Sequence, residues 1–244
     1  MKVLTLDTTT DTSSIAVADE NNLLAEYNFA HKMDLSRRLM PNIVSMLKDC
    51  ALRIKDLNCI GVSLGPGSFT GLRIGVATAK TLAQVLNIPI VGIITLDLLA
   101  YQFDYLPNAT VCPLVKVRKG EVYWAFFNTC DGKIKQITDY SAGPINEVIK
   151  MAQSLFPHPK IESQKSERRI IFCGDGVEDA LEELSKSLGD RVVPASKWLS
   201  YPKASILARL TSEKIAAGET SDPLSLVPFY IRRSAPEMRL EHGQ

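Results

Sequence analysis

A glycine-rich turn between an apolar run and a long helical pattern sets tight limits on the fold of this chain. Residues 59–64 are almost wholly apolar, as in a buried strand, and the turn 65–71 follows directly. A helical pattern then runs from about Thr70 to Leu86. A strand, a turn and a helix in this order are typical of α/β proteins, and they direct helix N-terminal N–H groups at one point. The turn therefore predicts either an anion site or a plain corner in which Ser68 or Thr70 caps the helix.

Strand and helix patterns recur along the chain in two similar halves. Each half opens with short apolar runs between polar turns, as in a strand meander, and continues with strand and helix patterns. Strands are expected near residues 3–7, 15–18, 23–29, 59–64, 90–94, 111–117, 121–127, 133–138 and 170–173. Helices are expected near residues 35–50, 70–86, 96–103, 177–188 and 204–217. This order predicts an α/β fold with two lobes, residues 1–105 and residues 106–244.

Five sequence motifs resemble those of one protein family. The most specific is Gly-Pro-Gly-Ser-Phe-Thr-Gly-Leu-Arg-Ile-Gly at residues 65–75. The others are Leu4-Thr5-Leu6-Asp7-Thr8-Thr9, Gly120-Glu121-Val122-Tyr123-Trp124-Ala125, Cys173-Gly174-Asp175-Gly176 and Pro228-Phe229-Tyr230-Ile231-Arg232-Arg233. Over nearly its whole length the chain resembles the TsaB-type (YeaZ-like) family, the dimerisation subunit of the bacterial machinery that makes threonylcarbamoyladenosine in tRNA.

The resemblance implies a fold, a role and partners. The family has the two-lobed fold of actin and hexokinase, in which each lobe is a mixed β-sheet flanked by helices. It implies a non-catalytic subunit that binds and activates a TsaD-type catalytic subunit, which transfers a threonylcarbamoyl group to N6 of adenosine in tRNA. A TsaE-type ATPase is expected in the larger complex, and a homodimer is expected when the chain is alone. Contact with tRNA is expected to be indirect.

The first two long helices are predicted to form the partner-binding surface. Gly71, Gly75 and Ala79 recur at every fourth residue and form a strip with almost no side chain. Glycine inside a helix costs about 1 kcal/mol against alanine, so we expect another backbone to approach Gly75 closely. Gly75→Leu is then expected to block association while the monomer stays folded. The alternative is that both helices only cover their own sheet, which is the usual fate of an amphipathic helix.

In the TsaB-type family this helix pair makes a four-helix contact with a second copy or with the catalytic subunit. By resemblance, the residues expected at the contact are Leu35, Leu39, Ile43, Gly71, Arg73, Ile74, Gly75, Thr78, Ala79 and Leu82.

A residual nucleotide site is the second candidate. In actin-fold enzymes the first hairpin holds phosphate, and a glycine loop after a later strand holds adenosine. By resemblance, weak ATP or ADP binding is expected at Asp7, Thr8, Thr9, Gly65, Gly67, Ser68, Gly174 and Gly176, and no resident cofactor is expected. The alternative for each loop is a turn whose side chains bond its own backbone or cap the next helix. A stand-alone actin-fold ATPase or kinase that uses Asp7 and these loops is the alternative function.

No metal centre is predicted. The histidines His31, His158 and His242 have no paired spacing. The related catalytic subunit carries an HxxxH metal pair where this chain has about Thr95 and Leu99, which are not useful ligands.

Two further positions bear on catalysis. Residues 61–65 match the GxSxG elbow of α/β-hydrolases, but no helix is expected directly after Ser63, so a serine hydrolase is rejected. Lys116 stands where many relatives have an aspartate, which makes ATP hydrolysis less expected.

Charge and composition point to a cytoplasmic protein without a broad nucleic-acid surface. The formal net charge is +1, whereas nucleic-acid-binding domains are usually strongly basic. Local contact with tRNA is left open for the basic tail around Arg232, Arg233 and Arg239. The five cysteines show no CxxC spacing, and no apolar run is long enough to span a membrane.

Overall fold

The computed structural model describes residues 1–19, 22–30, 34–157, 169–229 and 231, and the chain forms two compact units. The first unit contains Met1–Leu98 and Tyr201–Phe229, and the second contains Leu99–Ser200. The arginines of the predicted basic tail lie outside the described residues.

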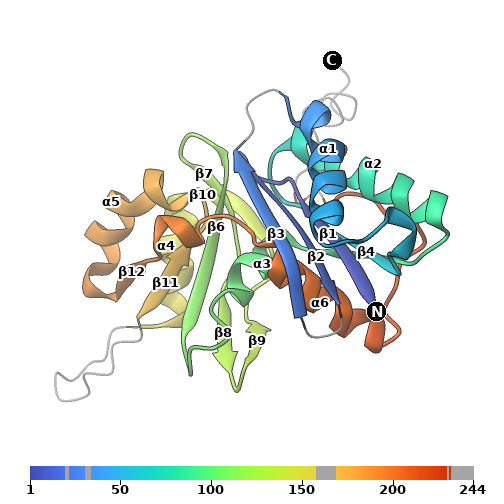
Figure 1. Ribbon diagram of the computed structural model, residues 1–244. Helices are drawn as coiled ribbons and strands as arrows, with labels where there is room; N and C mark the ends of the chain where they lie inside the picture. The colour runs from blue at the N-terminus through green and yellow to red at the C-terminus, as the bar shows by residue number, and fades with distance from the viewer. Residues whose placement is uncertain (20–21, 31–33, 158–168, 230, 232–244) are drawn as a thin grey trace. The chain divides into compact units, whose positions relative to one another are not determined.

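One mixed sheet organises the first unit (Figure 1). Its strand order is β3-β2-β1-β4-β5. β2 is antiparallel to both β1 and β3, whereas β4 is parallel to both β1 and β5. The strands are β1 (Lys2–Asp7), β2 (Thr12–Asp19), β3 (Asn22–Ala30), β4 (Cys59–Ser63) and β5 (Ile90–Ile93).

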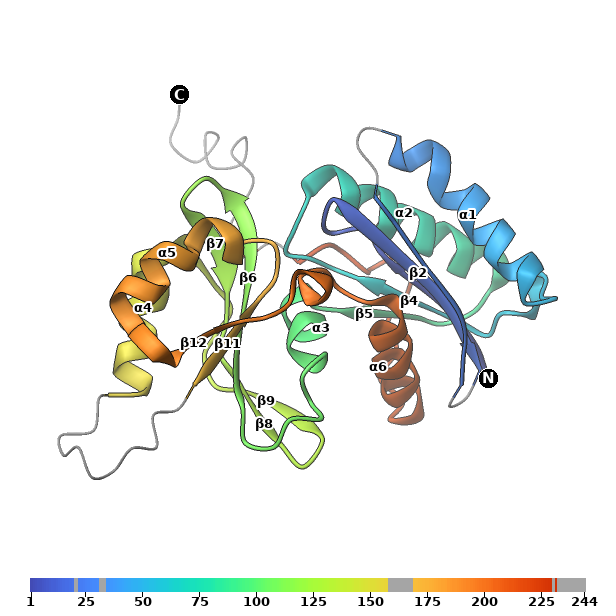
Figure 2. The same ribbon diagram turned by 60° about the vertical axis from the view of Figure 1, so that its left-hand side comes forward.

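Helices cover both faces of this sheet. α1 (Leu35–Asp49) and α2 (Phe69–Leu86) lie side by side on one face, and α6 (Ala204–Ala216) lies on the other (Figure 2). Alternate strand residues such as Leu4 and Leu6 share one buried apolar cluster with α1 and α2. Among the described residues, every helix falls short of the length and apolarity of a bilayer-crossing segment.

The second unit contains another mixed sheet, with the order β10-β7-β6-β11-β12 and a β8–β9 hairpin that joins it through β6. Its core lies between this sheet and two contacting helices, α4 (Ile145–Leu155) and α5 (Val177–Leu188). α3 (Thr95–Tyr101) joins the first unit to the second. The strands are β6 (Thr110–Arg118), β7 (Glu121–Trp124), β8 (Phe127–Cys130), β9 (Lys133–Gln136), β10 (Ser141–Pro144), β11 (Ile170–Cys173) and β12 (Val192–Pro194). The short 3-10 helices of the chain are η1 (Ile54–Asp56), η2 (Gly189–Arg191) and η3 (Lys197–Leu199).

The two sheets repeat one topology. In the first sheet, β1 is antiparallel to β2 and parallel to β4, and β4 is parallel to β5. In the second sheet, β6 is antiparallel to β7 and parallel to β11, and β11 is parallel to β12. β6, β7, β10, β11 and β12 thus occupy the positions of β1, β2, β3, β4 and β5. The predicted class, an α/β protein with two mixed sheets flanked by helices, is confirmed.

Three features of the second unit differ from the prediction. The strand expected at residues 121–127 is two strands, because the chain bends at the buried residues Ala125 and Phe126. β7 therefore pairs with the second half of β6, and β8 pairs with its beginning. The helix α4 and the short strands β10 and β12 were not predicted. β10 and β12 have only four and three residues, too few to show a clear period.

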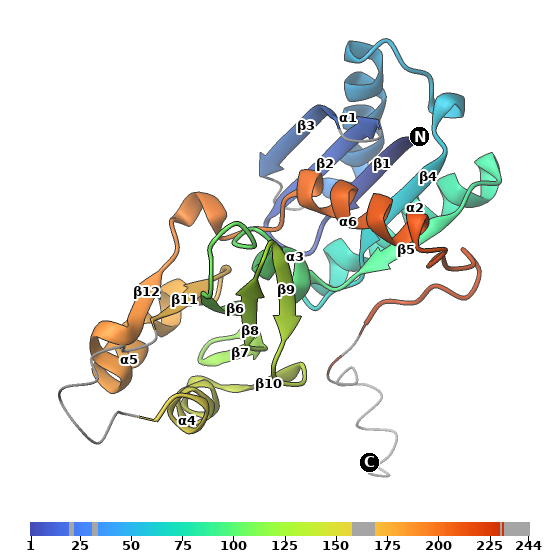
Figure 3. The ribbon, with the colours of Figure 1, turned by 90° about the horizontal axis from the view of Figure 1, so that it is seen from below.

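The division of the chain also differs from the predicted boundary near residue 105. Tyr201–Phe229 belongs to the first unit, although it follows the whole second unit in the sequence. The reason is α6, which packs along β1, β2, β4 and β5 (Figure 3).

Side chains of the sheet cap the beginning of α6. Its N-cap residue, Lys203, makes no side-chain cap. Instead, the backbone N–H of Ala204 donates to Ser14 Oγ at 2.9 Å, and that of Ser205 donates to Glu26 Oε1 at 2.8 Å. Glu26 Oε1 also accepts the Ser205 hydroxyl at 2.8 Å. A carboxylate at a helix N-terminus satisfies free N–H groups and suits the helix dipole, so Glu26 fixes α6 to the sheet across 179 residues of sequence.

Glu26→Ala is expected to lower the free energy of unfolding by about 1–3 kcal/mol, because two helix N–H and hydroxyl donors lose a charged acceptor. Urea unfolding followed by circular dichroism measures this. Glu213→Ala is the matched control, since Glu213 lies on the same helix in an exposed pair with Arg209 at 4.0 Å. That control should change stability by about 0.5 kcal/mol or less. Equal losses in the two variants would contradict the anchoring role.

Candidate functional site

Most residues predicted for the partner contact point into the first unit. Leu35, Leu39 and Ile43 of α1 are 3%, 1% and 0% exposed and belong to the core under the helix pair. On α2, Ala79 and Leu82 are 0% and 8% exposed and belong to the same core. The isolated chain therefore assigns these residues to its own core, which corrects the expectation that they form an exposed surface.

The glycine strip of α2 packs against the loop after β1. A Cβ added at Gly71 would lie 2.0 Å from the backbone oxygen of Thr8, and one added at Gly75 would lie 2.1 Å from Thr8 Oγ1. Thr8 Oγ1 also donates a hydrogen bond to the Gly71 carbonyl at 2.8 Å. At Gly71 the close neighbour is the Thr8 backbone, whereas at Gly75 it is the Thr8 side chain and not the backbone that the sequence predicted. In both cases the approaching residue belongs to the same chain. Gly71 and Gly75 therefore also leave the predicted contact set.

The opposite faces of α1 and α2 are exposed and partly apolar. Val44 is 55% exposed, and Phe69 and Val85 are 44% and 78% exposed. The Arg73 guanidinium lies 3.9 Å from the centre of the Phe69 ring. Of the predicted contact residues, Arg73 is exposed, and Ile74 and Thr78 are partly exposed. We call ten exposed residues of the two helices the outer face: Arg37, Pro41, Val44, Lys48, Asp49, Phe69, Arg73, Ala77, Thr81 and Val85.

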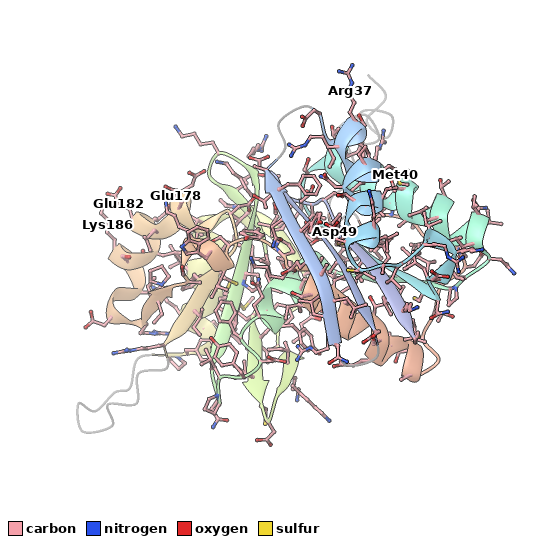
Figure 4. All side chains as sticks on the ribbon, in the orientation of Figure 1. Arg37, Met40, Asp49, Glu178, Glu182 and Lys186 are labelled. Atoms are coloured by element: carbon pink, nitrogen blue, oxygen red, sulfur yellow. The ribbon has the colours of Figure 1, made fainter. Side chains whose placement is uncertain are left out.

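Both ends of α1 are attached to β3. Near its beginning, Arg38 Nη1 donates to the Ala30 carbonyl at 2.8 Å, and its guanidinium lies over the Phe29 ring at 5.2 Å. At its end, the Tyr27 hydroxyl donates to the Asp49 carboxylate. These contacts hold the outer face on a fixed helix, with Arg37 and Asp49 near its two ends (Figure 4).

The glycine loop before α2 is bonded by the chain itself. Ser68 Oγ accepts from Gly71 N–H at 3.3 Å and so caps α2. The Ser68 N–H donates to the Thr9 carbonyl at 2.7 Å. Carbonyl oxygens of Thr8 and Thr9 thus occupy the space next to Gly71 and Gly67, and these oxygens repel an anion. The contacts favour the alternative in which the loop is a corner with a capped helix.

Asp7 has local partners in the same loop. Its side chain is 0% exposed and accepts from the Thr9 N–H at 3.2 Å and from the Thr9 hydroxyl at 3.0 and 3.1 Å. A buried carboxylate needs such donors, and Thr9 supplies them. The bonding matches a turn stabilised by its own side chains.

The second glycine loop ties β11 to β6. The Gly176 N–H donates to the Leu114 carbonyl at 2.9 Å, and Asp175 Oδ1 accepts from the Lys116 N–H at 2.9 Å. Gly174 has φ +98°, and a Cβ there would lie 2.3 Å from the Leu114 oxygen. Glycine is required at this position for packing alone.

Lys116 has an acidic partner. Its Nζ lies 2.5 Å from Asp179 Oδ2 in the first turn of α5, and both side chains are about half exposed. These residues line a pocket of the second unit with a volume of about 40 Å³, together with Arg118 and Glu121. The ion pair with Asp179 gives the Lys116 ammonium a partner within the chain.

Ser63, which was considered as a nucleophile, and three cysteine thiols are buried. Ser63, the last residue of β4, is 1% exposed, and α2 begins only at Phe69. Burial raises the pKa of the Cys59 thiol to about 12 and also raises the pKa of the Cys112 and Cys173 thiols, which keeps all three protonated.

In the part of the chain that the structure describes, no three His, Cys, Asp or Glu side chains group as metal ligands.

Sequence reasoning missed Val44, Phe69 and Val85, the most exposed apolar residues of the two helices. A usable signal was present in the sequence, because the core face and the glycine strip of α2 leave Arg73, Ala77, Lys80 and Gln84 as its more exposed side. Of these, Arg73, Ala77 and Gln84 are exposed, and Lys80 is partly exposed. Extending that stripe by a helical turn in each direction reaches Phe69 and Thr81.

The chain is similar to proteins of tRNA modification. A family model described as "TsaD: tRNA N6-adenosine threonylcarbamoyltransferase" matches residues 30–239. The tRNA threonylcarbamoyladenosine biosynthesis protein TsaB of Bacillus subtilis is 31% identical over 244 residues, with 100% of both chains covered. The protein of the same name from Escherichia coli is 26% identical over 241 residues, with 98% of both covered.

Solved structures show the same fold. YeaZ from Pseudomonas aeruginosa has a TM-score of 0.74 and 22% identity, and the match covers 94% of this chain and 99% of that one. A second structure from P. aeruginosa, of an uncharacterized protein with similarity to peptidase YeaZ, has a TM-score of 0.75 and 22% identity, with 95% and 99% covered.

Gly75→Leu is now expected to destabilise the first unit, contrary to the expectation of a folded monomer, because the new side chain would overlap Thr8 Oγ1. We expect the free energy of unfolding to fall by about 3 kcal/mol or more. Ala77→Leu, two positions away on the exposed side of α2, should change it by about 0.5 kcal/mol or less. Thermal and urea unfolding of the isolated chain compare the two. A Gly75→Leu protein as stable as Ala77→Leu would contradict the packing against Thr8.

Proposed function

The chain belongs to the TsaB (YeaZ-like) family, and we propose that it is the non-catalytic subunit that binds and activates a TsaD-type catalytic subunit. Relatives of full-length similarity are named for the biosynthesis of tRNA threonylcarbamoyladenosine, and the chain takes part in that modification. The reaction itself, transfer of a threonylcarbamoyl group to N6 of adenosine, is then carried out by the partner.

The outer face is the observation that carries the proposal. Val44, Phe69 and Val85 are large apolar side chains that remain 55%, 44% and 78% exposed on two neighbouring helices. Exposed apolar side chains grouped on one surface favour a protein contact. Aromatic and arginine side chains, here Phe69 and Arg73, are enriched at the centres of such contacts.

A surface formed by two neighbouring helices suits a four-helix contact. A partner that presents two helices of its own would bury Val44 and Val85 together. A two-fold contact uses the same patch on both chains, so a homodimer and a complex with the catalytic subunit would compete for the outer face. A TsaE-type ATPase is then expected to join the larger complex elsewhere, and tRNA is expected to contact the partners.

The loops support a role without catalysis. Asp7 is 0% exposed and bonded to Thr9, and the loop before α2 is filled by carbonyls of its own chain. A kinase or ATPase of this fold would need these groups free for phosphate and metal.

Reconstitution tests the role. Threonylcarbamoylation of tRNA is measured with the other pathway proteins, with and without this chain. We expect activity to require the chain, and we expect the chain alone to release no phosphate from ATP. Activity that is indifferent to the chain would contradict the helper role.

A single charge on the outer face tests the surface. Val44→Asp should weaken binding to the catalytic subunit at least tenfold, because an aspartate buried in an apolar contact lacks donors, and typical central contact residues contribute about 2 kcal/mol or more. Isothermal titration calorimetry measures the dissociation constant. Leu23→Asp is the matched control, since Leu23 is 50% exposed but lies on β3, next to α6. Equal affinities for the two variants would place the contact elsewhere.

A further inference from the structure

The charged groups of the outer face are almost all of one sign. α2 contributes Arg73 and contains no aspartate or glutamate. Its other cation, Lys80, is outside the outer face and donates to the Leu224 and Leu226 carbonyls. α1 adds Arg37 and Lys48, which are exposed, and the carboxylate of Asp49, which accepts the Tyr27 hydroxyl. The other carboxylate of this region, Asp34, lies 3.8 Å from Arg38. The whole chain has a formal net charge of only +1, so this face is more basic than the protein as a whole.

Arg37 lies in the first turn of α1, where a positive charge lowers the stability of the helix. The first turn of α1 contains Arg37 and Arg38 and no acidic residue, although the helix dipole favours anions there. Arg38 has a structural task, because it bonds the Ala30 carbonyl and covers Phe29. Among the residues that the structure describes, Arg37 has no such partner, and its side chain points away from the unit (Figure 4). Packing among the described residues therefore does not account for Arg37.

A two-fold contact through this face brings like charges together. Each copy would bring Arg37, Lys48 and Arg73 to the contact, and Asp49 is the one acidic residue of the outer face. Cations within about 10 Å of one another repel at moderate ionic strength, since the Debye length has that size. The apolar residues Val44 and Val85 are self-complementary, but the charges are not.

We infer that the outer face selects a partner whose surface places carboxylates around apolar side chains, and that it disfavours a second copy of this chain. This inference rests on the proposed function and names the chemistry of the catalytic subunit's matching surface. Apolar side chains supply attraction to either partner, and the basic residues distinguish between them.

The test measures two equilibria of the full chain at 50 mM and 500 mM NaCl: binding to the catalytic subunit of the same organism by calorimetry, and self-association by sedimentation. Added salt should weaken the complex with the catalytic subunit by about tenfold and tighten self-association by about threefold, because screening removes attraction in one case and repulsion in the other.

Arg37→Glu should weaken the complex with the catalytic subunit by about tenfold at 50 mM NaCl, and should tighten self-association by about threefold. The variant should fold, since a glutamate suits the first turn of a helix. Lys133→Glu is the control: it changes the net charge equally, at an exposed position of β9 in the second unit, and should leave both equilibria unchanged.

The outcomes separate the two proposals. A complex whose affinity is independent of salt, or an Arg37→Glu protein that behaves like Lys133→Glu, would overturn the charge selection and leave the helper role intact. Self-association that weakens with salt would also overturn it. Failure of the unaltered chain to bind the catalytic subunit at either salt concentration would instead overturn the proposed function.

Discussion

The close packing of α2 against the loop after β1 is the contact on which the first unit depends. It requires Gly71 and Gly75, because the oxygen atoms of Thr8 occupy the positions of their absent side chains. The same contact fills the space in front of the glycine loop, so that Ser68 caps the helix and carbonyls stand where an anion would bind. It also fixes the rotation of α2 about its axis, which directs Arg73 and Ala77 outward.

The second dependence is the return of the chain to the first sheet. α6 follows the whole second unit, yet Glu26 and Ser14 bond its first N–H groups from the sheet. Because α6 covers the face opposite to α1 and α2, both faces of the first sheet are buried by helices, and the outer sides of the helix pair remain exposed. The second sheet repeats the topology of the first. The second unit uses its glycine loop to join β6 and β11.

Surface charge and exposed apolar side chains coincide on one part of the molecule. The exposed side chains of α1 and α2 include Val44 and Val85 together with Arg37, Lys48 and Arg73, in a chain whose formal net charge is +1. Hydrophobic contact gives affinity to any apolar partner, whereas charge decides between partners. If the proposed contacts with a second copy and with the catalytic subunit use this one surface, its charges would supply the selectivity between them.

The sequence by itself determined the fold class and most elements, because local periodicity and turn residues are properties of short segments. The bounds of β1, β4, α2 and α5 agree with the patterns within one or two residues. It also indicated that a backbone must approach Gly75, since a glycine inside a helix needs compensation. Only the tertiary structure decided that the neighbour of Gly75 is the Thr8 side chain and not a backbone, and hence which side of each helix is exposed. Thr8 and Gly75, like Glu26 and Ser205, are distant in the chain and meet only after the sheet has formed, so no local pattern records their contact.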